Sequence, residues 1–459
     1  MRVHDTAVRP PGAPALAERV RGPVLHPGSP GYEAECATFN LMVRHHPAIV
    51  VGATGVADVL AAVRHAAAHD LPVAVQATGH GVSLPADGAL LISTRRMTGV
   101  QVDPHTRLAR VEAGVRWEQV VHEAAAFGLA PLNGSSPLVG VVGYTLGGGM
   151  GPLGRKYGYA ADHVRGIEVV TADGHLHEVS DLREPDLFRA LLGGKGNFGV
   201  VTALEFELAP VSRLYGGGLY FAGEHAPEVL RTWRRWADGL DDETTSSIAL
   251  LRLPAVPDVP EPLRGRLTAH VRIAHLGSAR QGERLVAPLR GVAPALIDSV
   301  AEMPYSAVAR IHEDTTVPVA YHERNILLRD LDDTALDALL ALVGPGSECR
   351  DPMVEIRQLG GALGRPPRRP NAVGNRDAAF CLTTLSPPDD DGIGPELFAA
   401  LRPWGTGRRY VNFLSGPDTA ELTRDAYDAA TFDALRRVKA VHDPRNLFRV
   451  NHNIPPQTH

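Results

Sequence analysis

The sequence predicts an α+β protein of two domains, and three observations support this. With 459 residues, 44% of them hydrophobic and 21% charged, the chain exceeds what one hydrophobic core usually organises and can fill two. Glycine-rich segments that could cradle a ligand end near Arg213. Beyond that point amphipathic helical patterns alternate with apolar extended runs, which is typical of a sheet covered by helices on one face.

The first half predicts short strands and helices in alternation. Apolar residues in 56–69 recur at the spacing of one helical face, and strand-like runs at 48–51 and 71–75 flank this helix. A second helix over 117–127 is closed by Gly128. Further strands are predicted at 89–93, 99–102, 108–111, 167–171 and 176–179.

The second half predicts a separate sheet. Helices are expected over 226–240, 279–289 and 331–343, and strands at 247–251, 267–273, 352–359 and 379–385. Near Arg408 the pattern changes again, to a strand at 410–414 and a helix at 420–441 that Asp443-Pro444 ends. The two ends of the chain are therefore expected to form one domain around the middle one.

Composition excludes several classes of partner. The net charge is −6 without a basic run, so no nucleic acid partner is expected. Three widely spaced cysteines cannot make a disulfide framework, which favours a reducing compartment. Residues 1–30 lack the apolar core of a signal peptide, and no apolar run approaches the roughly 18 residues of a membrane helix. We expect a soluble, cytoplasmic protein, either a monomer or a small homo-oligomer, with no membrane contact.

The most informative stretch is Gln76-Ala77-Thr78-Gly79-His80-Gly81, a glycine-flanked turn that follows a strand-like run. Backbone N–H groups in such a turn can bind a pyrophosphate, and the imidazole of His80 can form a covalent bond to a cofactor ring. We interpret His80 as a flavin anchor. The alternative, a buried structural histidine, stays open.

Other motifs are weaker. Residues 149–154 fit GxGxxG, and Asp173 lies near the spacing of a ribose-binding acid, as in a nicotinamide dehydrogenase. The following Arg155-Lys156-Tyr157-Gly158 offers no helix N-terminus to a pyrophosphate, which argues against that function. His175 and His177 share a strand face without a third ligand, so no metal site is expected, and no GxSxG motif indicates a serine hydrolase.

Five segments, in order, resemble those of the berberine bridge enzyme-like flavoproteins, which belong to the vanillyl-alcohol-oxidase or PCMH-type FAD enzymes. They are 77–81, 134–151, 191–202, 410–413 and 442–455. The resemblance implies a two-domain α+β PCMH-type FAD-binding fold with an antiparallel-sheet substrate domain. The expected parts are an FAD-binding domain at 1–210 with its core at about 43–210, a substrate-binding domain at 211–405, and a C-terminal berberine-bridge segment at 406–459 that completes the FAD domain.

The resemblance also implies the cofactor, FAD, held through a single 8α-histidyl link at His80. Many members carry a second tether at a cysteine where this chain has Ser136. Val139 matches the residue over the flavin C4a face that governs access of oxygen, with simple packing as the alternative, and Asn197 is expected to lock its loop. The expected cofactor-binding residues are Gln76, Ala77, Thr78, Gly79, His80, Gly81, Ser136, Pro137, Val139, Gly140, Gly143, Tyr144, Gly147, Gly148, Gly151, Asn197, Gly199, Val201, Asn412 and Asn451.

Tyr410 matches the family's active-site tyrosine and is expected to be the catalytic base. A phenol needs a nearby cation or hydrogen-bond donors to ionise at neutral pH, and Arg408, Arg409, Arg357 or the flavin environment would have to supply them. Glu355 is a second catalytic candidate, as a base or as part of an internal ion pair.

Gln358 and Tyr144 are the expected substrate contacts. Strand alternation puts Glu355 and Arg357 on one face and Gln358 on the other, so these three side chains cannot all point at a substrate.

The resemblance implies an FAD-dependent oxidase. It would transfer a hydride from a small-molecule substrate to flavin, and O2 would reoxidise the flavin to give H2O2. An alcohol or amine in secondary-metabolite tailoring is the expected substrate. A carbohydrate oxidase, an O2-unreactive flavin dehydrogenase and a flavin-binding protein stay open as alternatives.

Overall fold

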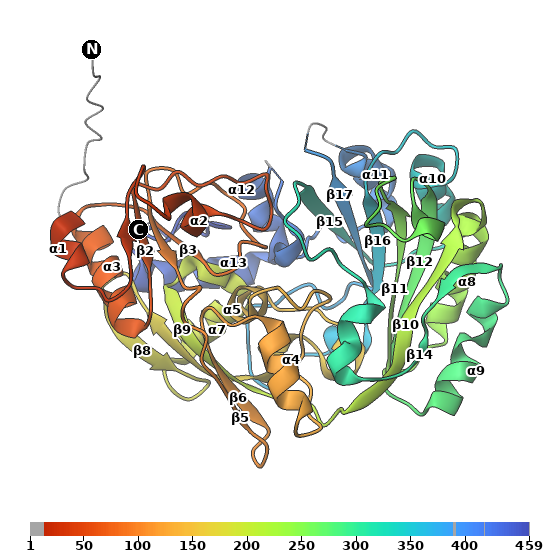
Figure 1. Cartoon of the computed structure of the whole chain (residues 1–459), viewed down its shortest axis with the longest axis horizontal. Helices are drawn as coiled ribbons and strands as arrows, with labels where there is room; N and C mark the ends of the chain where they lie inside the picture. The colour runs from red at the N-terminus through yellow and green to blue at the C-terminus, as the bar shows by residue number, and fades with distance from the viewer. Residues whose placement is uncertain (1–12, 389–391, 417, 459) are drawn as a thin grey trace.

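The computed structural model describes residues 13–388, 392–416 and 418–458. The chain forms two lobes (Figure 1). The first lobe holds two small sheets, and the second holds one large sheet. The last helix returns to the first lobe, where α13 (Ala429–His442) packs against α7 (Pro185–Gly194).

The first lobe is built on a mixed and an antiparallel sheet, and in the mixed one β1 (Val24–Leu25) pairs antiparallel with β2. β2 (Ile49–Gly52) and β3 (Val73–Gln76) each pair in parallel with β4 (Leu90–Ser93), and α3 (Val56–Ala68) connects β2 to β3. The second sheet has the order β5-β6-β9-β7-β8. Its strands are β5 (Val100–Asp103), β6 (Leu108–Glu112), β9 (Val200–Glu207), β7 (Val164–Val170) and β8 (Leu176–Val179), and the helices nearby are α4 (Trp117–Ala125), α5 (Val141–Leu146) and α7 (Pro185–Gly194).

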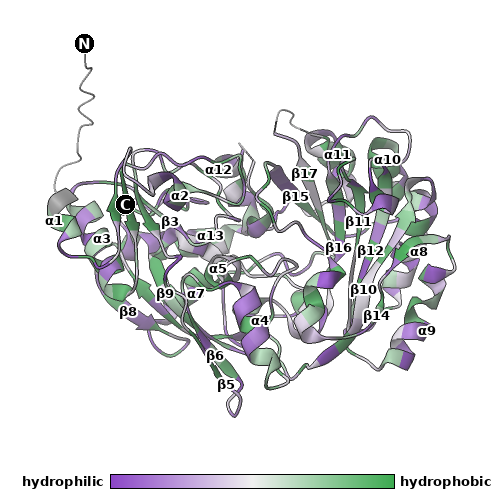
Figure 2. Ribbon diagram, in the orientation of Figure 1, coloured by the Kyte–Doolittle hydropathy of each residue, from purple (hydrophilic) through white to green (hydrophobic). Residues whose placement is uncertain are grey.

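The second lobe is an eight-stranded antiparallel sheet with the path β13-β10-β12-β11-β16-β17-β15, on which β14 also pairs with β10. Helices α8 (Ala226–Asp238), α9 (Ala279–Arg290), α10 (Asp333–Val343) and α11 (Gly394–Ala400) lie together at the outer side of this sheet (Figure 1). Both hydrophilic and hydrophobic residues colour α8 and α9 in Figure 2, as expected of helices with one buried face. The strands are β10 (Arg213–Ala222), β11 (Thr244–Arg252), β12 (Leu267–His275), β13 (Ala295–Asp298), β14 (Ala301–Pro304), β15 (His322–Leu328), β16 (Met353–Gln358) and β17 (Phe380–Ser386).

Register divides this sheet into an apolar and a polar face. Ile356 pairs with Ile248 and Leu382, and these three belong to the core under the helices. The next row, Arg357 with Ser247 and Cys381, therefore points the other way. The polar face is the one turned towards the first lobe.

Most predicted elements are confirmed within two or three residues, but two predictions for the C-terminal segment are wrong. Residues 411–413 form the short 3-10 helix η8 (Val411–Phe413) instead of a strand, because the Asn325 side chain binds Tyr410 N and O and Phe413 O in place of a partner strand. The predicted helix at 420–441 is divided into α12 (Thr419–Leu422), η9 (Thr423–Ala426) and α13 (Ala429–His442), and Asp428 caps the last of these.

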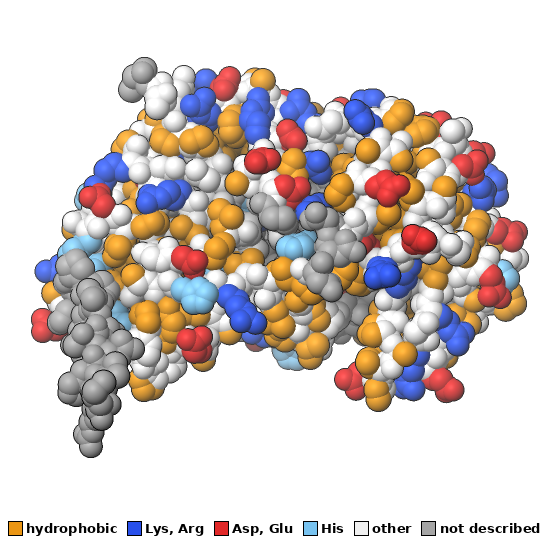
Figure 3. Space-filling view, turned by 90° about the horizontal axis from the view of Figure 1, so that it is seen from above, with side chains coloured by type: hydrophobic (Ala, Val, Ile, Leu, Met, Phe, Trp, Pro, Cys, Tyr) orange, Lys and Arg blue, Asp and Glu red, His pale blue; other side chains and the backbone are white. Residues whose placement is uncertain are grey.

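The charge distribution on the surface and the hydropathy of the helices bear on the expected partners. Lys/Arg and Asp/Glu side chains are interspersed on the face seen in Figure 3. Among the described residues, no helix combines the length and the hydropathy that crossing a bilayer requires. Residues 1–12, at the start of the predicted first domain, lie outside the described part of the chain.

Candidate cofactor and active site

The turn after β3 leaves His80 with one unused nitrogen. Nδ1 lies 2.9 Å from Thr78 Oγ1, whereas Nε2 is buried and has no partner among the described residues. The Phe39 ring stacks on the imidazole with 3.8 Å between ring centroids. Burial, assisted by the charge of Arg116, lowers the pKa of His80 to about 4. The imidazole is therefore neutral at physiological pH, and Nε2 can carry an available lone pair.

Two glycines near this turn leave room beside the backbone. A Cβ at Gly143 would meet nothing within 4 Å, and one at Gly81 would meet only Lys195 Nζ, at 3.9 Å. Gly147 and Gly151 are small for another reason, because a Cβ there would lie 1.9 Å from Asn412 Oδ1 and 1.9 Å from Asn133 O, respectively. The glycine density therefore serves contacts within the protein as well as space for a ligand.

The loop after α7 brings a lysine to the same place. Lys195 has φ 55, and its Nζ donates a hydrogen bond to Asn412 Oδ1 at 2.8 Å. Burial lowers the pKa of Lys195 to about 8, opposed by Glu323. Asn197 locks this loop as expected, since its Nδ2 donates to Gly194 O and His452 O and its Oδ1 accepts from the N–H of Ile454.

Tyr410 does not meet the conditions for an ionised base. Its hydroxyl accepts a 3.3 Å hydrogen bond from Asn412 Nδ2, and burial raises its pKa well above the usual value. The three arginines expected to act on it are engaged elsewhere: Arg408 with Tyr427 O, Arg409 with Asn325 O at 2.6 Å, and Arg357 with Glu355 at 2.8 Å. These surroundings favour the neutral hydroxyl of Tyr410, and its role as the base stays a prediction.

Glu355 belongs to an internal ion-pair cluster. Its side chain is 1% exposed and accepts from Arg272 at 2.5 Å, Arg357 at 2.8 Å and Ser247 Oγ at 2.8 Å. Burial alone would raise the pKa of Glu355, but Arg357 and Arg272 outweigh it and hold this pKa well below its usual range. A carboxylate so strongly stabilised is a poor proton acceptor, and of the two expected roles the structure supports the ion pair.

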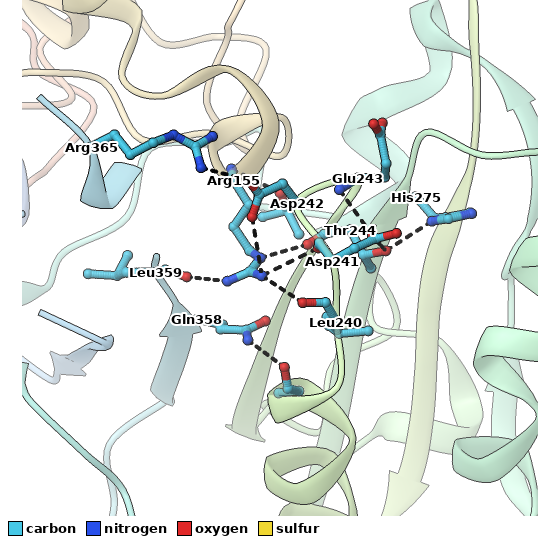
Figure 4. Close-up of polar contacts among 12 residues, drawn as sticks. Arg155, Leu240, Asp241, Asp242, Glu243, Thr244, His275, Gln358, Leu359 and Arg365 are labelled. Atoms are coloured by element: carbon cyan, nitrogen blue, oxygen red, sulfur yellow. Dashed lines mark hydrogen bonds and ion pairs between the residues drawn. The ribbon is translucent and has the colours of Figure 1, made fainter. Parts of the chain in front are cut away.

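The two expected substrate contacts, Gln358 and Tyr144, also make contacts within the protein. Gln358 donates from Nε2 to Ala237 O of α8 at 2.6 Å (Figure 4), on the helix side of the sheet. The Tyr144 ring packs edge-on against Trp117 with 5.4 Å between centroids, and its hydroxyl is buried. Their roles as substrate contacts stay predictions, since Gln358 also lines a cavity together with Arg357, and the Tyr144 carbonyl accepts from Asn412 Nδ2 at 2.9 Å.

Several expected cofactor residues are occupied by the protein itself. The Gln76 side chain bonds His45 at 2.9 Å and Ala37 O at 2.8 Å. A Cβ at Gly199 would lie 2.5 Å from Val170 O, and Val201 is buried in β9. Asn451 donates to Gly196 O at 3.1 Å and keeps its Oδ1 buried without a partner among the described residues.

Residues 150–155 join the two lobes next to this region. Arg155, buried at 6% exposure, donates to the carbonyl groups of Leu240, Asp241, Thr244 and Leu359 (Figure 4). A small cavity of about 30 Å³ is lined by Met150, Ser247, Arg272, His312 and Arg357, among others. The polar face of the large sheet is therefore held at a fixed distance from the glycine-rich segment.

Sequence reasoning missed Glu323 on β15. Its carboxylate forms no hydrogen bond or ion pair with any residue that the structure describes, and burial raises its pKa to about 8, mainly opposed by Arg357. Arg272 and Lys195 were also missed as members of the site. A lysine inside the glycine-rich run 193–199 was a signal that could have been used, whereas Glu323 stands in no motif.

Two family models match separate segments of the chain, and several known proteins match nearly its whole length. A family model described as "FAD binding domain" matches residues 47–180, and one described as "Berberine and berberine like" matches 409–455. (R)-6-hydroxynicotine oxidase of Paenarthrobacter nicotinovorans is 29% identical, over 95% of this chain and 97% of that protein. Chitooligosaccharide oxidase of Gibberella zeae is 26% identical, over 94% and 92%.

Solved structures agree with this likeness. 6-Hydroxy-D-nicotine oxidase from Arthrobacter nicotinovorans superimposes with a TM-score of 0.81 and 27% identity, covering 95% of this chain and 98% of that one. Physcomitrella patens BBE-like 1 gives a TM-score of 0.83 at 20% identity, covering 97% and 99%.

The residues present fit an FAD cofactor. Two atoms that lack a hydrogen-bond partner within the described ranges, His80 Nε2 and Asn451 Oδ1, lie on the segments where the flavin and its phosphates are expected. The open space at Gly81 and Gly143 lies on the same segments. The neutral state of His80 suits it to covalent attachment rather than to an ion pair.

Proposed function

Because the chain is a berberine bridge enzyme-like FAD-dependent oxidoreductase with the two-domain α+β PCMH-type fold, we propose that it is an oxidase of a small-molecule amine or alcohol, of the kind found in secondary-metabolite tailoring. Bound FAD supplies the hydride acceptor and the later reaction with O2 that yields H2O2. The substrate supplies a hydride and a proton, and the protein holds and orients it.

The observation that carries this proposal is the meeting of His80 with an ionisable network. Lys195 Nζ lies 3.9 Å from the Cβ position of Gly81, next to His80, and bonds Asn412, which in turn bonds Tyr410. An expected cofactor tether therefore lies beside side chains that can position a substrate and move a proton. Such an arrangement supports redox chemistry on a substrate bound at the junction of the two lobes.

The tether is proposed to form through Nε2 of His80. Thr78 Oγ1 occupies Nδ1 and fixes the ring, which leaves Nε2 as the available nucleophile. Ser136, whose Oγ accepts from the N–H of Leu138 at 3.4 Å, cannot supply the thioether of a second link. We therefore propose one covalent bond to FAD.

The polar face favours an amine or alcohol over an oligosaccharide. Sugar-binding sites use flat aromatic surfaces, but Tyr220 is already stacked on His270 at 3.8 Å, and the Phe413 ring carries the Arg357 guanidinium at 5.0 Å. The relatives named for hydroxynicotine are full-length matches and support the same class. Carbohydrate oxidation is the second candidate, supported by the chitooligosaccharide oxidase match.

The test is flavin bleaching without oxygen. Holoenzyme is mixed anaerobically with panels of N-heterocyclic amines, other amines, alcohols and oligosaccharides while the flavin absorbance is followed. Bleaching by an amine or alcohol, then recovery in air with one H2O2 formed per flavin, is the expected result. Bleaching only by oligosaccharides would overturn the substrate class, and bleaching without recovery in air would make the protein a dehydrogenase.

We also propose a reducing, cytoplasmic location. Cys36, Cys349 and Cys381 are all buried and free, which suits a compartment that keeps thiols reduced. Fractionation of producing cells, with thiol counting on the purified protein, tests this proposal. Secretion of the native protein would contradict it.

A further inference from the structure

We propose that Glu323 and Lys195 form the proton-transfer pair of this site. The Glu323 carboxylate accepts the proton of the substrate, and the Lys195 ammonium on the opposite lobe favours the charged form of that carboxylate. The inference rests on the oxidase function proposed above and names its base, a role that the environments of Tyr410 and Glu355 do not support.

Glu323 is held by its backbone and free at its carboxylate. Its N–H donates to Ser415 Oγ at 3.1 Å, and its carbonyl accepts from Ser415 N at 3.0 Å. Asn325, two residues on, pairs with Thr383, which pairs with Glu355, so Glu323 and Glu355 lie on the same polar face. The Glu323 carboxylate has no hydrogen bond or ion pair within the described ranges, so its oxygens are not engaged by the protein there and can accept a proton.

Lys195 occupies a backbone conformation that favours glycine. Its φ is 55, and glycines flank it on both sides. The side chain reaches Asn412 Oδ1 at 2.8 Å and lies by the Gly81 backbone. A lysine placed here at conformational cost, with its Nζ directed at the expected cofactor turn, points to a functional charge.

Both groups titrate close to neutral pH. Burial raises the pKa of Glu323 to about 8, with Arg357 and Lys195 opposing and Glu355 and Asp314 adding to the rise. Burial lowers the pKa of Lys195 to about 8, and only Glu323 opposes this. The other ionisable groups that face the pair are Tyr321, beside Glu323, and His452, beside Lys195. Two interacting groups in one pH range lose their protons in steps that belong to the pair.

The substrate loses its proton and its hydride to different acceptors. The O–H or N–H bond of the substrate breaks, and its proton goes to a Glu323 oxygen. The electron pair left on the heteroatom forms a C=O or C=N bond while the neighbouring carbon loses a hydride to FAD. The substrate is oxidised by two electrons, and O2 finally accepts them.

The first experiment measures ionisation without turnover. The chain has only three lysines, Lys156, Lys195 and Lys439, so holoenzyme made with lysine labelled with 13C at the ε carbon gives three assignable signals. The signal lost in Lys195→Arg is that of Lys195. It is expected to titrate near pH 8 and to shift to lower pH in Glu323→Gln, because the Glu323 charge raises the pKa of Lys195. An unchanged titration in Glu323→Gln would overturn the pair.

The second experiment measures anaerobic flavin reduction against pH. Glu323→Gln is expected to reduce the rate by about 10²–10⁴-fold and to remove the ionisation from the profile. Glu313→Gln, an exposed glutamate on the neighbouring loop, is the matched control and should behave as wild type. Lys195→Met should move the ionisation to higher pH, since the Lys195 charge lowers the pKa of Glu323, and Lys195→Arg should leave it near its wild-type position.

Wild-type reduction kinetics in Glu323→Gln would overturn the role of the base. This failure is separate from failure of the oxidase function. If no compound of the panel bleached wild-type flavin, the oxidase proposal would fall, whereas the lysine titration would still report whether the two side chains interact.

Discussion

Replacing Glu355 with glutamine removes the negative charge between two buried arginines. Arg272 and Glu355 are 3% and 1% exposed, and Arg357 lies 2.8 Å from the second carboxylate oxygen. Breaking a buried ion pair from one side typically costs about 3–5 kcal/mol, because the partner charge stays in the interior. With two arginines facing one carboxylate, we expect Glu355→Gln to lose a free energy of unfolding in the upper half of that range.

The matched control is an Arg–Glu pair in the same sheet that solvent reaches. Arg213 and Glu302 lie 2.9 Å apart at 53% and 47% exposure, and exposed pairs contribute about 0–1 kcal/mol. Urea unfolding followed by circular dichroism should therefore show a large loss in the midpoint for Glu355→Gln and almost none for Glu302→Gln, with similar slopes. Equal free energies of unfolding for the two variants would refute the stabilising role of the buried Glu355–arginine cluster.

The pH dependence has a definite sign. The folded-state pKa of Glu355 is depressed, so its contribution is present above the usual glutamate pKa and is lost as pH falls through the folded value. The stability gap between wild type and Glu355→Gln should stay constant from about pH 8 to pH 5 and narrow only below about pH 4. If the variant instead kept full stability and lost the ionisation in flavin reduction, Glu355 would be the base after all.

The remaining predictions concern single contacts. His80→Ala should release FAD on acid precipitation where wild type retains it, and release from wild type would disprove the tether. Val139→Leu should slow reoxidation by O2 and spare flavin reduction; equal reoxidation rates would remove this role. Tyr410→Phe loses the hydrogen bond from Asn412, which contributes about 1 kcal/mol, so flavin reduction should slow by about fivefold. The ionisation in the pH profile of flavin reduction should remain in this variant. If that ionisation disappeared, Tyr410 would be the base. Arg155→Met removes the donor that four carbonyl groups share, of which Asp241 O keeps the N–H of Thr244. It should lower the free energy of unfolding by about 3 kcal/mol, whereas a neutral effect would contradict the role of Arg155 in holding the two lobes together.

The sequence predicts well whatever a short window determines. The helix at α3 follows from apolar spacing, and the His80 turn follows from its glycines, of which Gly79 has φ 75. The C-terminal strand at 410–414 failed because its extended pattern is local, whereas the partner that decides its shape, Asn325, is 85 residues away from Tyr410. Tertiary hydrogen bonds overrode the propensity of that segment.

The residues of the site likewise differ in whether a short sequence window reveals them. Glu355 stands in a strand whose alternation is visible, so its face was predicted, but its two arginine partners on one carboxylate were not. Glu323 is the second residue of a strand that begins with His322, Glu323 and Arg324. Three polar residues in a row do not show the alternation of apolar and polar residues by which a strand is recognised in a sequence. Lys195 contacts Asn412 across 217 residues, and no sequence window contains both.

The polar face of the large sheet thus carries two carboxylates with opposite environments. Around Glu355, two arginines and a serine hydroxyl overcome the cost of burial, so that its proton affinity is very low. Around Glu323 the cost of burial prevails over Arg357 and Lys195, so that its pKa is raised to about 8. Two carboxylates separated in this way are suited to different tasks, one to orienting the arginines that line the cavity and the other to accepting a proton. Glu355→Gln should therefore lower the free energy of unfolding, and Glu323→Gln should change the pH profile of flavin reduction. Each variant is the control for the other.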